Sequence, residues 1–149
     1  MQVKEIMTKS PTYCTPDTPV QQVAQEMMKY DCGCLPVVES DARPKVVGMI
    51  TDRDIVCRAV AKGENPQFLT AAACMSTQVI SVTPETDMDT CCSLMEHHQV
   101  RRIPVVDALG FCQGIVAQAD IAEKCEAQKT AEVVRDISHH PESARPAYA

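Results

Sequence analysis

Apolar residues in the first half of the chain show helical spacing in one segment and continuous runs in the next. Between residues 20 and 28 they are spaced like one face of a helix. These positions are Val20, Val23, Ala24, Met27 and Met28. Two continuous apolar runs follow, at residues 35–38 and 46–50, and both have the length of buried strands. The pattern therefore predicts a helix, two strands joined by a polar turn, and a second helix over residues 52–62 that stops at Gly63.

The same pattern returns in the second half of the chain. At an offset of 68 residues, Met7-Thr8 matches Met75-Ser76 and Leu35–Val38 matches Ile103–Val106. After two extra residues in the first hairpin the offset becomes 66. The apolar helix positions of the second copy are Met88, Cys91, Cys92 and Met95. Self-similarity at a nearly constant offset indicates two copies of one structural unit.

Each copy begins with a lead-in segment, residues 3–7 or 71–75, and a short strand that ends at Thr15 or Thr83. The order strand-helix-strand-strand-helix, present twice, predicts an α/β (α+β) protein. We expect repeat 1 at residues 1–65, repeat 2 at residues 66–128, and a helix end and mobile C-terminal tail at residues 129–149. The last helix is expected to run from about Gln118 to about Arg135, and the tail to begin at about Ser138.

The junction between the second apolar run and the helix after it carries candidate binding chemistry. Thr51 stands at the helix N-cap, and Asp54 follows three positions later. The two form a capping box, which alone would explain them. The same junction also presents backbone N–H groups to an anion, and Asp54 is placed to accept hydrogen bonds from a ribose. On these residues alone, the capping box is the favoured interpretation.

Composition narrows the classes of function. The net charge of −6 and pI of about 5.1 argue against a nucleic-acid-binding surface, and the absence of tryptophan argues against base stacking. No apolar run approaches the length of a membrane span, and the N-terminus lacks the layout of a signal peptide. We therefore expect a cytoplasmic protein without membrane contact. No catalytic set of side chains is visible, so we do not expect an enzyme.

The nine cysteines raise the question of a metal or redox site. Seven of them align with an apolar residue of the other repeat, which favours small buried hydrophobic side chains. Cys34 and Cys57 align with charged residues, which makes these two the candidates for exposure and reactivity. The spacings contain no pair of CxxC motifs, and adjacent histidines do not form a chelate, so we expect no metal site.

The doubled layout resembles the tandem CBS domain pair (the Bateman module, named after cystathionine β-synthase), in its small stand-alone bacterial form. Four motifs and their second copies carry the resemblance over about residues 1 to 128. They are Met7-Thr8, Thr15-Pro16-Asp17, Leu35–Val38 and Gly48–Asp54. The resemblance implies pseudo-twofold repeats packed through their sheets, with clefts for adenosine-containing ligands: AMP, ADP, ATP, NAD or S-adenosylmethionine.

The resemblance also implies which residues bind. Family sites combine a glycine, a hydroxyl for phosphate and a carboxylate for ribose, which here are Gly48, Thr51 and Asp54. Repeat 2 keeps the carboxylate as Asp120 but has Ala117 in place of the hydroxyl. If the motif were only a helix cap, loss of the hydroxyl should make the carboxylate dispensable. Its presence therefore favours ribose binding at these positions.

Phosphate needs a cation beyond the helix terminus, because the terminus alone contributes about 0.3–1 kcal/mol. By the resemblance, Arg101 and Arg102 reach toward the site of the other repeat, whereas repeat 1 has Gly33 and Cys34 at those positions. Guanidinium groups suit bidentate phosphate contact. We therefore expect one competent site in repeat 1 and a degenerate one in repeat 2. A solvated surface pair is the alternative for the two arginines.

The sequence thus predicts a non-catalytic regulatory module that binds an adenosyl ligand in repeat 1. No cofactor is required, a homodimer is expected, and a regulated partner protein is unidentified. Two alternatives stay open. One is a ligand-free interaction protein that acts through dimerisation or a partner protein. The other is a thiol redox or metal sensor, which burial of Cys91, Cys92 and Cys112 in the core would disfavour.

Overall fold

The computed structural model describes residues 1–139 and shows an α+β fold with seven α-helices in that range. The bulk of the C-terminal tail expected from the sequence, residues 140–149, lies outside the described residues. The helices are α1 (Val3–Ile6), α2 (Val20–Lys29), α3 (Asp52–Arg58), α4 (Ala71–Cys74), α5 (Met88–His98), α6 (Gln118–Lys124) and α7 (Ala127–Ser138), and η1 (Val60–Lys62) is a 3₁₀ helix. The strands are β1 (Thr8–Lys9), β2 (Cys34–Val38), β3 (Val46–Thr51), β4 (Arg102–Val106) and β5 (Cys112–Ala117). None of these helices is long and apolar enough to cross a membrane.

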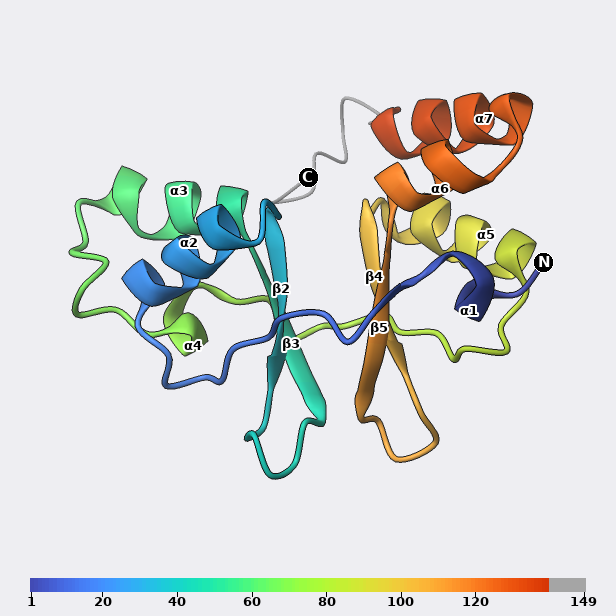
Figure 1. The fold of residues 1–149 in the computed structure, drawn as a ribbon. Helices are drawn as coiled ribbons and strands as arrows, with labels where there is room; N and C mark the ends of the chain where they lie inside the picture. Colours follow the sequence, from blue (N-terminus) through green and yellow to red (C-terminus); the bar gives the residue numbers. More distant parts are fainter. Residues whose placement is uncertain (140–149) are drawn as a thin grey trace. The chain divides into compact units, whose positions relative to one another are not determined.

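The chain divides into two compact units (Figure 1). Unit 2 consists of residues 11–79 and 109–112, and unit 1 of residues 1–10, 80–108 and the described chain from 113 on. Unit 1, which holds most of repeat 2, therefore also contains the lead-in segment of repeat 1. Unit 2, which holds most of repeat 1, contains the lead-in segment of repeat 2. The predicted boundary between residues 65 and 66 separates the two copies of the duplicated sequence, and it stays a prediction.

Unit 2 is built on an antiparallel pair, β2 and β3, with α2 and α3 packed beside it. Val20, Val23 and Met27 of α2 are buried, as their helical spacing predicts. Ala24 and Met28, which the same pattern placed on this face, are exposed. The predicted first strand is reduced to a single bridge between Cys14 and Val37.

Unit 1 repeats this arrangement with a three-stranded sheet in the order β1-β5-β4. All four predicted core positions of α5 (Met88, Cys91, Cys92, Met95) are buried. The single helix expected over residues 118–135 is instead two helices, because Cys125 has extended backbone at the end of α6. This break turns α7 back onto α5 and α6, where Val133 and Ile137 enter the core.

The lead-in segments join each unit through backbone hydrogen bonds. In unit 1, β1 pairs with β5, and Lys124 Nζ donates to the Ile6 carbonyl at 2.7 Å. In unit 2, Ser76 pairs with Met49 through two backbone hydrogen bonds of 2.9 and 3.0 Å. Arg58 Nη1 closes the end of α4 by donating to the Cys74 carbonyl at 2.8 Å. Arg58 and Lys124 thus each donate a hydrogen bond to a lead-in segment. Each lies one helical turn after a candidate carboxylate, Asp54 or Asp120.

Candidate functional site

The strand–helix junction of unit 2 contains the capping box that the sequence predicts. Thr51 Oγ1 accepts from the Asp54 N–H at 3.1 Å, and Asp54 Oδ2 accepts from the Thr51 N–H at 2.9 Å. Two of the free N–H groups at the start of α3 are satisfied in this way. The Asp54 side chain is 2% exposed, which is unusual for a carboxylate. The junction is therefore first of all a structural element.

The second oxygen of Asp54 is in a different situation. Oδ1 is buried and has no hydrogen-bond partner within residues 1–139, and the nearest cation in an ion pair is Arg58 Nη2 at 3.9 Å. The hydroxyl of Ser76 is also buried without a hydrogen-bond partner in this part of the chain. Buried polar atoms left unpaired cost about 1–3 kcal/mol each. Two unpaired buried polar atoms thus belong to unit 2.

The corresponding junction of unit 1 is satisfied from within. Asp120 Oδ2 accepts from the Ala117 N–H at 2.7 Å, as Asp54 does from Thr51. Asp120 Oδ1 accepts from the Thr8 hydroxyl at 3.3 Å, and Lys124 Nζ lies 4.0 Å from it. Thr8 aligns with Ser76 and Asp120 with Asp54. The same two positions are therefore bonded to each other in unit 1 and unpaired in unit 2.

This geometry changes one argument from the sequence. The presence of Asp120 was taken to favour ribose binding, because Ala117 cannot complete a capping box. The carboxylate nevertheless caps the backbone N–H of residue 117 and holds Thr8, and neither bond needs a hydroxyl at 117. A structural role is sufficient to explain Asp120, so this aspartate by itself is no evidence for a ligand.

The close packing of the chain explains the glycine at position 48 without any ligand. A β-carbon there would lie 2.9 Å from the Ser76 carbonyl oxygen and 2.9 Å from Met75 Sδ. Gly114 of unit 1 meets the Thr8 carbonyl oxygen in the same way, at 2.8 Å. Each glycine lets a lead-in segment approach its strand closely. The glycine of the motif thus places Ser76, or Thr8, beside the strand–helix junction.

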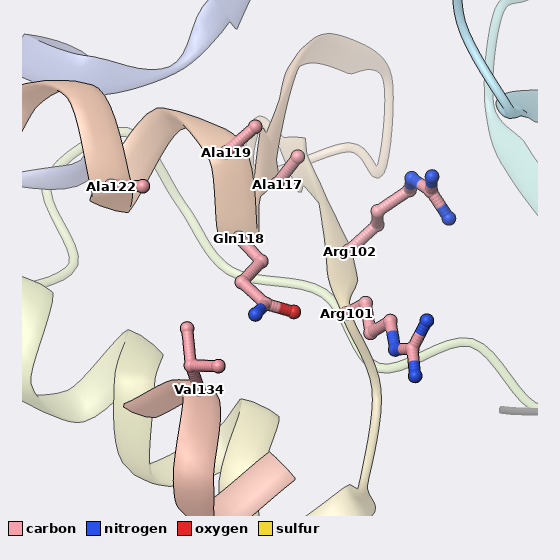
Figure 2. Close-up of a pocket in the computed structure, with 7 residues that line it drawn as sticks. All are labelled: Arg101, Arg102, Ala117, Gln118, Ala119, Ala122 and Val134. Carbon is pink, nitrogen blue, oxygen red and sulfur yellow. The ribbon is translucent and has the colours of Figure 1, made fainter. Parts of the chain in front are cut away.

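Arg101 and Arg102 lie in unit 1, beside a pocket of about 370 Å³ (Figure 2). The Arg101 carbonyl accepts from the Gln118 N–H at 2.9 Å, which ties the start of β4 to the start of α6. Figure 2 shows both arginine side chains leaving this strand and extending away from the three alanines, which lie at the start of α6 and along it. The lining residues are Arg101, Arg102, Ala117, Gln118, Ala119, Ala122 and Val134. The lining residues from the described chain include two arginines and no acidic residue, a composition that favours anions.

The predicted site residues thus fall into two groups. Gly48, Thr51 and Asp54 meet in unit 2, whereas Asp120 and the two arginines belong to unit 1. That the arginines serve the site of repeat 1 stays a prediction. Sequence reasoning missed Ser76 as a site residue. The signal was present, because Met75-Ser76 aligns with Met7-Thr8, but it was used only to find the repeat.

The cysteines give little support to a metal or redox site. Cys91 and Cys92 are buried, and burial raises their pKa values to about 12 and about 11, while Cys112 is half-buried. Of the two candidates for exposure, Cys57 is exposed, but Cys34 is buried at 7% exposure, because β2 is covered along its whole length. Within residues 1–139 no group of three metal-binding side chains is placed to hold an ion.

Comparison with known proteins identifies the fold. The family model of the CBS domain matches residues 3–60 and again residues 71–127. The chain belongs to the CBS domain family. It is 35% identical to the CBS domain-containing protein YhcV of Bacillus subtilis over 138 residues, which is 92% of this chain and 95% of that protein.

Solved CBS structures agree with this assignment. Hypoxic response protein I, crystallised with two coordinated zinc ions, has a TM-score of 0.76 and 32% identity, covering 85% of this chain and all of that chain. The CBS domain pair of protein MJ0100, solved with 5′-methylthioadenosine and S-adenosyl-L-methionine, has a TM-score of 0.74 and 28% identity over 83% of this chain and 94% of that chain. This chain is therefore a CBS pair, and one of its structural relatives binds adenosyl compounds.

Proposed function

We propose that this CBS pair is a cytoplasmic, non-catalytic regulatory module that binds an adenosine-containing ligand at repeat 1, as a homodimer. Family membership and the adenosyl complexes of the MJ0100 pair support the ligand class. The ligand's ribose would lie at the junction of Thr51 and Asp54. Binding would control a partner protein by favouring one arrangement of the module over another, which requires different ligand affinity in the two arrangements.

The observation that carries this proposal is the pair of unpaired atoms in unit 2. Among residues 1–139, Asp54 Oδ1 has no hydrogen-bond donor and Ser76 Oγ has no hydrogen-bond partner, whereas Asp120 and Thr8 bond to each other. A ribose diol offers two hydroxyls, each a donor and an acceptor, and would satisfy both atoms. Repeat 2 has already used its equivalent groups, so the proposed ribose site belongs to repeat 1.

The two arginines support an anionic ligand. Guanidinium contacts to phosphate are charge-assisted hydrogen bonds, worth about 1.5–3 kcal/mol each. Arg101 and Arg102 line the pocket beside Ala117, where no acidic side chain competes for them. In the proposal they hold the phosphate groups of a nucleotide, and AMP, ADP, ATP and NAD are the ligands that would use them.

A thermal-shift panel with AMP, ADP, ATP, NAD and S-adenosylmethionine tests the proposal. A ligand at 100 times its dissociation constant stabilises the native state by about 2.7 kcal/mol, a large change in melting temperature. The matched variants are Ser76→Ala and Thr8→Ala, which remove aligned hydroxyls from the two units. We expect Ser76→Ala to weaken binding up to about tenfold, the effect of one lost hydrogen bond, and Thr8→Ala to leave it unchanged.

Asp54→Asn and Asp120→Asn complete the design. The carboxamide introduced by Asp54→Asn retains an oxygen that can accept from the Thr51 N–H, so this variant tests the carboxylate with less damage to the cap than alanine. We expect binding to be lost in Asp54→Asn and retained in Asp120→Asn. Equal losses in the two variants would contradict a site in repeat 1. Loss of binding in Arg101→Ala combined with normal binding in Asp54→Asn would move the site to the arginine pocket.

A ligand-free interaction protein is the second candidate, and one observation favours it. Large apolar side chains are exposed on the helices of unit 2, among them Met28 at 80% and Val60 at 60%. Such surfaces usually contact other proteins. No response to any ligand of the panel would favour this function over the first.

A further inference from the structure

Helix α7 is an addition to unit 1 that the repeated layout does not contain (Figure 1). Unit 2, as the structure describes it, has no counterpart of α7, because α3 and η1 lead through residues 63–70 to α4. Among the buried apolar side chains of unit 1, α7 supplies Val133 and Ile137. The core of unit 2 forms without such a helix. A CBS unit of this chain can therefore keep its core when α7 is not in place.

The connection between α6 and α7 has the geometry of a hinge. Cys125 and Glu126 both have extended backbone, with ψ angles of 166° and 145°. Within the described chain, the N-cap of α7 makes no side-chain hydrogen bond to the helix. Extended residues between two helices can absorb a change of φ and ψ while each helix keeps its own hydrogen bonds. Helix α7 is therefore joined to unit 1 as a separate rigid piece.

The contact between α7 and α5 combines attraction at one end with repulsion at the other. Near the start of α7, Lys129 forms an ion pair with Asp89 of α5. Farther along, Glu96 of α5 lines a pocket of about 440 Å³ together with Glu132 and Asp136 of α7. Burial, and then the two carboxylates of α7, raise the pKa of Glu96. The second half of α7 thus lies against α5 at an electrostatic cost.

The side chain of Gln99, at the end of α5, adds a second cost to the attached position of α7. Its Nε2 donates to the Glu96 carbonyl at 2.7 Å and to the Asp136 carbonyl at 3.0 Å, so it clips α5 to α7. Its Oε1 is buried and has no hydrogen-bond partner within residues 1–139. A buried acceptor without a donor destabilises the state that buries it. Water would reach this oxygen and the three carboxylates if α7 lifted away.

We propose that α7 is a strap that detaches from α5 and α6 as one piece while the rest of unit 1 stays folded, and that its release opens the arginine pocket. The pocket is affected because Val134 of α7 lines it beside Gln118, together with Arg101 and Arg102 (Figure 2). The module would thus have a moving part next to the groups proposed to hold phosphate. The link with the pocket rests on the proposed function, whereas the release of α7 goes beyond it.

The thiol of Cys92 reports the position of α7. It is 4% exposed and lines the pocket between α5 and α7, whereas the aligned Ala24 of unit 2 is exposed. Helix α7 is therefore what covers this thiol. The neighbouring Cys91 is 0% exposed and belongs to the core of unit 1. Release of α7 would expose Cys92 and leave Cys91 buried, whereas unfolding of unit 1 would expose both.

The test is the alkylation of the full chain by iodoacetamide under native conditions. Mass spectrometry of the peptide that contains both thiols measures the rates of Cys91 and Cys92 separately. We expect Cys92 to react at least about tenfold faster than Cys91, because local opening is more frequent than unfolding of the unit. Equal rates, which unfolding alone would give, would overturn the proposal.

Val133→Ala and Val105→Ala are the matched variants, because both shorten a buried valine in the core of unit 1. Val133 lies on α7 and Val105 on β4, so release of α7 breaks the contacts of Val133 alone. We expect Val133→Ala to speed the alkylation of Cys92 about tenfold and Val105→Ala to leave it unchanged. Equal acceleration of Cys92 in the two variants would mean that it reacts only through unfolding, which would contradict the strap.

Amide hydrogen exchange is an independent measurement of the same opening. The amides of α7 should exchange together as one group, and faster than those of the buried positions of α5, because they open without the rest of unit 1. The same protection in α5 and α7 would show that the two helices open only together, and this result would also overturn the proposal.

Inorganic pyrophosphate tests the link with the arginine pocket. An anion that binds more tightly when the pocket is complete favours the attached position of α7. We expect saturating pyrophosphate to slow the alkylation of Cys92 about threefold or more, relative to sodium chloride at equal ionic strength. Arg101→Ala combined with Arg102→Ala should remove this effect. No slowing in the wild-type chain would contradict the link, and the ligand panel with Ser76→Ala separates that result from failure of the proposed function.

Discussion

At the scale of single residues, Asp54 and Asp120 differ only in what their second oxygen meets. Both cap the first turn of a helix, but Thr8 bonds Asp120 and nothing in the described chain bonds Asp54 Oδ1. The lead-in segment decides this, because it brings a hydroxyl from more than a hundred residues away to Asp120. The two candidate sites therefore differ in the partners of the carboxylate as well as in the motif, where Ala117 replaces Thr51.

Gly48→Ala tests the close approach of the lead-in segment to β3. The new β-carbon would lie 2.9 Å from the Ser76 carbonyl, and a backbone atom cannot move as a side chain can. We expect a loss of about 1–3 kcal/mol in the free energy of unfolding, measured by urea denaturation. Unchanged stability would show that the lead-in can shift without cost, which would also weaken the placement of Ser76.

The buried thiols predict a stability that depends on alkaline pH. Burial raises the pKa values of Cys14 and Cys91 from 9.0 to about 12, so the native state keeps both protons after the unfolded state has lost them. Their contribution is complete below pH 9 and is lost as the pH rises from 9 to about 12, by about 1.4 kcal/mol per pH unit for each thiol.

The comparison is with Cys14→Val combined with Cys91→Val, which introduces the residue found at each aligned position. Urea denaturation at a pH just below 9 and again about one unit above it should show a steeper loss of stability in the wild-type chain. Equal losses in the two proteins would mean that these thiols do not titrate as their burial requires.

At the scale of elements, α1 and α4 are exchanged between the repeats. Ile6 of α1 is buried in the core of unit 1, and the aligned Cys74 of α4 is buried in the core of unit 2. Ile6→Ala should therefore speed amide hydrogen exchange in residues 80–108, and Cys74→Ala should speed it in residues 11–79. Suppose instead that hydrogen exchange became faster only in the sequence repeat that contains the substitution. That result would contradict the placement of each lead-in segment in the unit of the other repeat.

The elements also show how far the sequence could predict the fold. Constant offsets were enough to find both repeats, the order of their elements and the family, because each copy supports the interpretation of the other. The break at Cys125 was missed, since residues 118–135 have helical composition throughout. α6 ends where the chain turns so that α7 can pack on α5. This is a tertiary effect, and the spacing of apolar residues along a helix does not predict it.

The candidate site was predicted less completely than the fold. Thr51 and Asp54 were found from their spacing and do form a capping box. Ser76 was missed because it belongs to the second repeat in the sequence and contributes to the unit that contains most of the first. A motif search examines neighbours in sequence, whereas this position acts on a strand almost thirty residues earlier.

At the scale of the whole molecule, the exchanged lead-ins set an order for folding during synthesis. Most of unit 2 is complete once residue 79 has left the ribosome, but residues 1–10 belong with a unit whose other segments begin at residue 80. Residues 1–10 are thus made well before the core that they enter. Until the second repeat emerges, Val3 and Ile6 have no core to enter and stay exposed on the nascent chain.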